Sequence, residues 1–196
     1  MVTFSAGGIR GGALRVPLAE GGPSAIVRTA MTFEDVVREH QDAVYGAALR
    51  ILGDRDAAHD AAHQAFIKAY RSIASYDQTR PIRPWLLRIA VNEAISIGRS
   101  RTRERARQAP DPDAAEIADR GATPERQTVD RESREAIRSA VARLPELYRV
   151  VVVLRYFNEL SVEEVATATG RSPSTVGVQL LRARQLLRKA MAGSGV

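Results

Sequence analysis

Two histidines, His59 and His63, stand four residues apart in the segment "HDAAH". On a helix this spacing places both rings on one face, as in the H-E-x-x-H motif of zinc peptidases. A catalytic zinc site needs a third protein ligand, but His40 is the only other histidine and the chain has no cysteine. Asp60 is also shorter than the glutamate usual in that motif. We therefore expect no metal and no cofactor, and two exposed or interfacial histidines.

A second chemically distinctive segment is "GRSPSTVGVQLLRARQLLRK", residues 170–189, which has five cationic side chains and no acidic one. Unpaired positive charge along a helix suits a polyanion such as DNA. The alternative is a helical hairpin with a solvated basic face.

Capping signals divide the region around this segment into two helices joined by a tight turn. Ser161 and Glu164 form a capping box, and Gly170 suits the left-handed residue that ends a helix. Ser172 is a good N-cap and Pro173 fits the first helical position. This order predicts a helix-turn-helix, in which the start of the second helix enters the major groove of DNA.

The second helix has a core side and an outer side. The 4-3-4 spacing of its apolar residues predicts a core stripe of Val176, Leu180, Ala183 and Leu187. We expect an outer side made of Ser174, Thr175, Gln179 and Arg182. The predicted duplex DNA site comprises Arg171, Ser172, Ser174, Thr175, Gln179, Arg182 and Arg184.

Gly177 lies inside this helix, where glycine costs about 1 kcal/mol relative to alanine. Either the backbone must approach DNA closely at this position, or the helix tolerates a softened turn. The sequence leaves both explanations open.

The composition of the chain limits the kinds of partner that these motifs can bind. The chain has 196 residues, 44% hydrophobic and only 5% aromatic, with a net charge of +6. A basic balance suggests nucleic acid or an anionic membrane surface as partner, or simple solubility. The chain shows no apolar run long enough to span a bilayer and no secretory signal, so we expect no membrane insertion and a cytoplasmic location.

Helical periodicity predicts an all-α fold in which two small helical domains are joined by a flexible linker. Residues 1–30 are glycine-rich and predicted to be disordered, either as a regulatory tail or because Met31 is the natural start. Residues 31–107 form the first domain and 128–192 the second, which contains the helix-turn-helix. Residues 108–127 have proline and aspartate but no apolar face, as in an exposed linker.

The first domain shows three helical segments. Thr32 with Asp35 resembles a capping box, Gly53 suits the end of the first helix, and the second starts near Asp56 with an alanine-rich inner face. The third, "PWLLRIAVNEAISIGRSRTRERAR", is amphipathic and then cationic. Its basic end either tracks phosphates or is simply solvated.

Three stretches carry a family resemblance, namely "AAHDAAHQAFIKAYRSI", "RPWLLRIAVNEAI" and "RLPELYRVVVVLRYFNELSVEEVATATGRSPSTVGVQLLRAR". Residues 32–190 resemble a bacterial RNA polymerase sigma factor of the extracytoplasmic-function (ECF) type. The resemblance implies a transcription initiation factor whose partners are core RNA polymerase and promoter DNA. An anti-sigma partner is common in the family, although no residue here identifies one.

The resemblance also assigns roles within the first domain, which is similar to sigma region 2. Its second helix matches the segment that docks on polymerase, so His59, Asp60, His63 and Gln64 are the predicted polymerase contacts. The family usually has an acid where His59 stands and a glutamine where His63 stands.

Promoter melting needs a surface that holds unstacked bases, which planar groups beside cations provide. The loop before the third helix and the start of that helix fit this role. The predicted melting residues are Tyr76, Arg80, Arg83, Arg88 and Asn92, with Trp85 in the core.

The sequence also bears on two other classes of protein. A stand-alone helix-turn-helix regulator would share the last segment, but it has no need of the helix "PWLLRIAVNEAI" with its basic end. The chain contains no nucleophile–base set and no phosphate-binding glycine motif, so we predict that it is not an enzyme.

Overall fold

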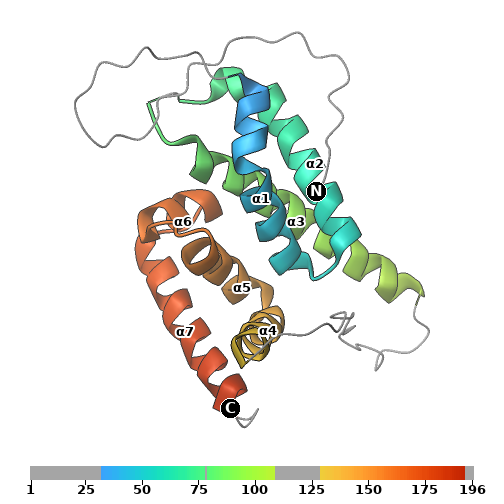
Figure 1. Ribbon diagram of the computed structural model, residues 1–196, viewed down its shortest axis with the longest axis vertical. Helices are drawn as coiled ribbons and strands as arrows, with labels where there is room; N and C mark the ends of the chain where they lie inside the picture. The colour runs from blue at the N-terminus through green and yellow to red at the C-terminus, as the bar shows by residue number, and fades with distance from the viewer. Residues whose placement is uncertain (1–31, 78, 109–128, 193–196) are drawn as a thin grey trace.

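The computed structural model describes residues 32–77, 79–108 and 129–192, and no strand occurs among them. The first half contains α1 (Phe33–Leu52), α2 (Arg55–Ser72), the short 3-10 turn η1 (Ile73–Ser75) and α3 (Ile82–Gln108). The second half contains α4 (Val129–Ala142), α5 (Glu146–Val152), the π-helical turn η2 (Val153–Phe157), α6 (Val162–Thr169) and α7 (Pro173–Ala192). The predicted all-α fold with a helix-turn-helix is confirmed (Figure 1). The predicted disordered extension at 1–30 and, apart from Gln108, the predicted linker lie outside the described residues.

Side-chain caps explain where α1 and α2 begin. Thr32 and Asp35 form the predicted capping box, and Gly53 ends α1 in the left-handed region with φ 69°. Asp54 then caps α2 by accepting a hydrogen bond from the backbone N–H of Ala57 at 2.9 Å. The helix therefore starts just before the predicted Asp56.

Small side chains let α2 approach its two neighbours. Its inner face is built largely of buried alanines, which carry little bulk between backbones: Ala57, Ala58, Ala61, Ala62, Ala65 and Ala69. α1 and α3 both pack on this helix, so the first half is a three-helix unit.

The helix-turn-helix has the predicted caps. Ser161 and Glu164 form the capping box of α6, and Gly170 ends that helix with φ 66°. The Ser172 hydroxyl accepts a hydrogen bond from the backbone N–H of Thr175 at 3.2 Å, and Pro173 is the first residue of α7.

A strained turn connects η2 to α6. Asn158 is buried, and both its backbone N–H and its side-chain Nδ2 donate to the carbonyl of Val153, at 3.1 Å each. Glu159 follows with φ 59°, a left-handed conformation that no other non-glycine residue in the described ranges adopts.

The two halves share one hydrophobic core. A single cluster of buried residues joins Ala48 and Ile51 of α1 and Val91 of α3 to Leu154 and Val165 of the second half. α5 and α6 lie beside α1 and α3 (Figure 1). A second cluster around Phe66 and Leu86 belongs to the first half alone. The two sequence domains are thus packed together in this structure, while their exact boundaries remain a prediction.

Arginine contacts reinforce this junction. Arg149 of α5 donates through Nη1 to the carbonyl of Ile51 at 2.6 Å, one of the carbonyls that the end of α1 leaves without a helical partner. The same side chain donates to the carbonyl of Leu144, and Arg50 lies over the ring of Phe157 at 4.5 Å from its centroid.

Candidate nucleic-acid and polymerase interface

The start of α7 presents a polar, exposed surface. Ser174 and Thr175 are exposed, and both side-chain hydroxyls lie within 2.9 Å of the Ser172 hydroxyl. Arg182 and Arg184 are exposed further along the helix. Because the helix N-terminus is positive and no acidic residue lies on α7, this surface favours phosphates.

One predicted member of this surface lies elsewhere. The expectation that Gln179 faces outwards is wrong, because its residue surface is only 8% exposed. Three positions after Val176, it is about 60° from the core stripe on a helical wheel, and so it turns inwards. Its amide oxygen accepts a hydrogen bond from Nη1 of half-buried Arg171 at 2.9 Å. This pair positions the turn between α6 and α7.

α3 carries the remaining predicted melting residues on and before its first turns. Arg88 and Asn92 are exposed one turn apart, so they share a face of the helix. Arg83 is half-buried, and exposed Arg80 lies 3.2 Å from the Asp77 carboxylate. These cations lie in the loop that precedes α3 and on the first turns of that helix.

Tyr76 does not contribute an exposed ring to this surface. It is 7% exposed, its ring lies 4.8 Å from that of Trp85, and its hydroxyl donates to the carbonyl of Arg80. Burial raises the pKa of Tyr76 to about 12, with a smaller contribution from Asp77. The expectation that this ring is free to stack on bases is therefore wrong, whereas Trp85 packs against the core as predicted.

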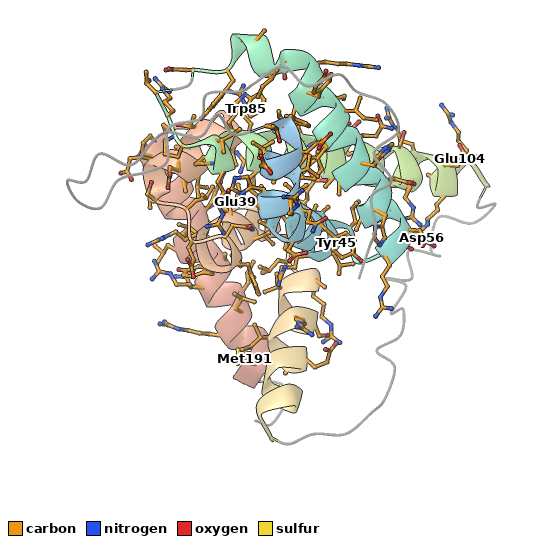
Figure 2. The ribbon with its side chains drawn as sticks, turned by 45° about the horizontal axis from the view of Figure 1, so that its top comes forward. Glu39, Tyr45, Asp56, Trp85, Glu104 and Met191 are labelled. Atoms are coloured by element: carbon orange, nitrogen blue, oxygen red, sulfur yellow. The ribbon has the colours of Figure 1, made fainter. Side chains whose placement is uncertain are left out.

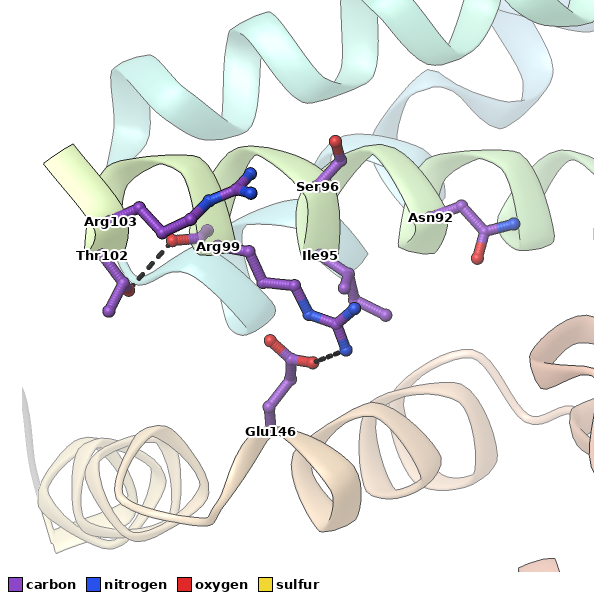
Figure 3. Close-up of a pocket in the computed structure, with 8 residues that line it drawn as sticks. Asn92, Ile95, Ser96, Arg99, Thr102, Arg103 and Glu146 are labelled. Carbon is purple, nitrogen blue, oxygen red and sulfur yellow. Dashed lines mark hydrogen bonds and ion pairs between the residues drawn. The ribbon is translucent and has the colours of Figure 1, made fainter.

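A groove of about 780 Å³ runs between α3 and α5 (Figure 3). Asn92 lines this α3–α5 groove. Arg99 extends across it, and its Nη2 lies 3.0 Å from Oε1 of Glu146. Its full lining is Asn92, Ile95, Ser96, Gly98, Arg99, Thr102, Arg103 and Glu146. Helical spacing from Arg88 could have identified Ser96 and Arg99 as part of the same face, but Glu146 could come only from the packing of the two halves.

The cationic end of α3 lies at the opposite end of the helix from Trp85 (Figure 2). Arg101 pairs with Asp54 at 3.1 Å. The hydrogen bond that Arg101 donates to that carboxylate is the main cause that raises the pKa of Arg101, and Asp56 and Asp60 add to it. Arg103, Arg105 and Arg107 are exposed, so this end presents positive charge to solvent.

The predicted polymerase contacts lie together on α2. Asp60, His63 and Gln64 are exposed, and half-buried His59 packs its ring 4.5 Å from that of Tyr45. In the part of the chain that the structure describes, no group of three or more potential ligands could hold a metal ion. This arrangement suits a protein interface.

None of the helices in the described ranges has both the length and the apolar character needed to cross a membrane.

Two family models match the chain. Sigma-70 region 2 matches residues 36–104, which include α2 and most of α3, and Sigma-70 region 4 matches residues 134–187, which include the helix-turn-helix.

Whole-chain comparisons agree with these matches. The chain is 34% identical to the ECF RNA polymerase sigma factor SigW of Bacillus subtilis, covering 81% of this chain and 88% of that protein. It is 32% identical to the RNA polymerase sigma-H factor of Pseudomonas aeruginosa, covering 81% and 86%. The fold is similar to that of the sigma factor RpoE in complex with the anti-sigma factor NepR from Bartonella quintana, with a TM-score of 0.66, 22% identity and coverage of 82% and 96%. Because both regions match and these relatives cover most of its length, the chain belongs to the ECF family of RNA polymerase sigma factors.

Proposed function

We propose that the helices of this sigma factor divide its work on polymerase and promoter. As an ECF sigma factor, the chain binds core RNA polymerase and directs promoter-specific transcription initiation. In the proposal, the exposed face of α2 around Asp60 docks on the polymerase, α3 holds the melted minus-ten element, and α7 reads the minus-thirty-five element as duplex.

The observation that carries the assignment for α7 is the combination of its caps, its exposed N-terminal hydroxyls and its charge. Exposed Arg182 and Arg184 stand on a helix without acidic residues. Such a surface binds phosphates for position while its first residues meet base edges.

The assignment for α3 is supported by the face that carries Arg88 and Asn92 and continues along the α3–α5 groove. Cations beside a polar amide can hold a displaced single strand, and the arginines that follow would track its phosphates. Tyr76 contributes indirectly, by fixing the loop that carries Arg80.

The match to region 2 at residues 36–104 excludes the stand-alone regulator as the function of this chain. Sigma factors are initiation factors, and we assign the chemistry of RNA synthesis to the polymerase and none to this chain. We place the protein in the cytoplasm, where the template is transcribed. The fold is similar to that of a sigma factor bound to an anti-sigma factor, and this similarity supports an anti-sigma factor as a further partner.

Run-off transcription tests this proposal directly. The full chain is added to core polymerase with a library of promoter fragments from its source genome, and start sites are mapped. We expect starts at a fixed distance downstream of a shared pair of sequence elements. Transcription that does not depend on the added chain, or starts without a shared upstream element, would contradict the proposal.

A further inference from the structure

Among the large apolar side chains that are exposed on α7, Val178 and Leu181 are the most exposed, and they lie on the side of the helix away from its buried residues. Val178 is 50% exposed and Leu181 is 52% exposed. At about 100° per residue, they lie roughly 200° and 140° around the helix from buried Val176. α7 packs against α4, α5 and α6 through its opposite side, and it forms the outer edge of the molecule (Figure 1).

Gly177 adjoins this pair and has no reason within the described structure to be glycine. A Cβ built at this position would meet nothing within 4 Å. Its backbone is helical rather than left-handed. Neither internal packing nor backbone conformation requires glycine here, so the residue is compatible with a partner that approaches the backbone of α7 closely from outside.

The surroundings of this apolar patch indicate which partner approaches. Ser174 and Thr175 precede it, and the exposed cations Arg182, Arg184 and Arg188 lie beside or beyond it on the same helix. α7 has no acidic side chain. A short apolar strip between hydroxyls and arginines matches the major groove, where the C5-methyl group of thymine is the apolar feature between phosphate walls.

We propose that Val178 and Leu181 read thymine methyl groups in the minus-thirty-five element, and that Gly177 lets the backbone of α7 approach closely enough for that contact. This inference rests on the proposed role of α7 in duplex recognition. It makes Val178 and Leu181 specificity-determining residues, whereas the arginines position the helix without selecting sequence.

The test removes the methyl group alone. After promoter mapping, each thymine of the minus-thirty-five element is replaced in turn by deoxyuridine, which keeps base pairing and groove hydrogen bonds. Binding of the complete holoenzyme to each duplex is then measured. At one or two positions we expect about a fourfold loss of affinity, the effect of removing one buried methyl group.

Variants assign that loss to residues. Val178→Ala should show the same loss on the thymine promoter and no further loss with deoxyuridine at the matching position, and Leu181→Ala should behave likewise at its own position. Met191→Ala, at an exposed apolar residue near the far end of α7, is the matched control and should keep full sensitivity to deoxyuridine. Gly177→Ala should raise the melting temperature of the protein yet weaken promoter binding.

Several results would overturn the inference. If deoxyuridine has no effect at any position while the holoenzyme still binds the duplex, thymine methyls are not read, although the proposed role of α7 survives. If Val178→Ala weakens binding to core polymerase without DNA, the patch is a protein interface. If the holoenzyme does not bind the minus-thirty-five duplex at all, both the inference and the proposed role of α7 fail.

Discussion

Glu159 occupies a turn whose backbone conformation is unfavourable for a residue with a side chain. Its φ of 59° precedes the Ser161 cap of α6, and a side chain in the left-handed region costs about 1–2 kcal/mol. The turn keeps this conformation because buried Asn158 and the capping box fix both of its sides.

We therefore expect Glu159→Gly to stabilise the protein by about 1 kcal/mol, which raises the melting temperature by about 2–4 °C. Thermal denaturation followed by circular dichroism measures the shift. Glu163→Gly, at an exposed position in the first turn of α6, is the control and should destabilise instead, because it removes an acidic side chain from the helix N-terminus and adds a residue of low helix propensity. A lower melting temperature for Glu159→Gly would show that its side chain makes a compensating contact.

His40 is a buried titratable residue of α1. Burial lowers its pKa, and Arg83 lowers it further while Glu39 raises it. The unfolded chain therefore binds a proton more readily than the folded one, so this contribution to stability is present above about pH 6.5 and is lost as the pH falls through the folded pKa.

We expect His40→Gln to reduce the loss of unfolding free energy between pH 7.5 and 5.5. Urea denaturation of both proteins at the two pH values measures it. An identical pH dependence in the variant would place the acid-sensitive group elsewhere.

Among the helices, α2 and α7 are the two proposed to bind partners through their exposed surfaces. On α2, His59 and His63 stand where the family resemblance of the sequence predicts an acid and a glutamine. His59→Glu with His63→Gln should tighten core polymerase binding roughly two- to fivefold, since an exposed ion pair contributes up to about 1 kcal/mol.

Fluorescence titration of labelled protein with core polymerase measures this change. Ala106→Glu, which adds the same charge on the exposed end of α3, should leave the affinity unaltered. If the double variant also binds with unaltered affinity, the histidines lie outside the interface.

On α7, Arg182 is exposed beside the apolar patch. If it contacts a phosphate, Arg182→Ala weakens binding to all duplexes and flattens the slope of log affinity against log salt by about 0.9. Filter binding of the holoenzyme between low and moderate salt gives the slope. An unaltered slope would mean that this arginine contacts protein or solvent.

The sequence predicts these elements well because caps and periodicity are local. Thr32, Ser161, Gly170 and Pro173 each act within one turn of their own position, and the structure places all four as expected. The predicted exposure of Gln179 was wrong because a residue at the edge of a core stripe can turn inwards when a neighbour such as Arg171 offers a hydrogen-bond partner.

The predicted exposure of the Tyr76 ring was wrong for a related reason. Its polar hydroxyl and its loop position suggested exposure, but the ring fills the core against Trp85 and the hydroxyl finds a carbonyl nearby. The groove between α3 and α5 could not be predicted from the sequence, since it depends on contacts between residues about fifty positions apart.

For the whole molecule, the closed packing conflicts with the proposed promoter contacts. The two elements are separated by roughly 25 base pairs, or about 85 Å at about 3.4 Å per pair. A compact chain of this size has a radius of gyration of about 16 Å and a diameter of about 40 Å. The two halves must therefore separate before α3 and α7 can reach both elements.

Holding the halves together should block transcription. The chain has no cysteine, so Arg99→Cys with Glu146→Cys introduces the only thiols, across the α3–α5 groove. A short, reducible bis-maleimide linking them should lower run-off transcription at least tenfold, and cleavage of the linker should restore it. Single-cysteine variants given the same reagent are the controls. Full activity of the linked protein would show that both elements are reached without opening.

The shared core also governs the timing of holoenzyme assembly. Separating the halves divides the buried cluster that contains Ile51, Leu154 and Val165, so opening exposes apolar surface and is an uphill event within a single molecule. If polymerase captures the open form, the observed assembly rate stops rising with polymerase concentration once capture outpaces opening. Beyond that concentration, the response of the promoter follows the opening rate of this chain rather than the supply of polymerase.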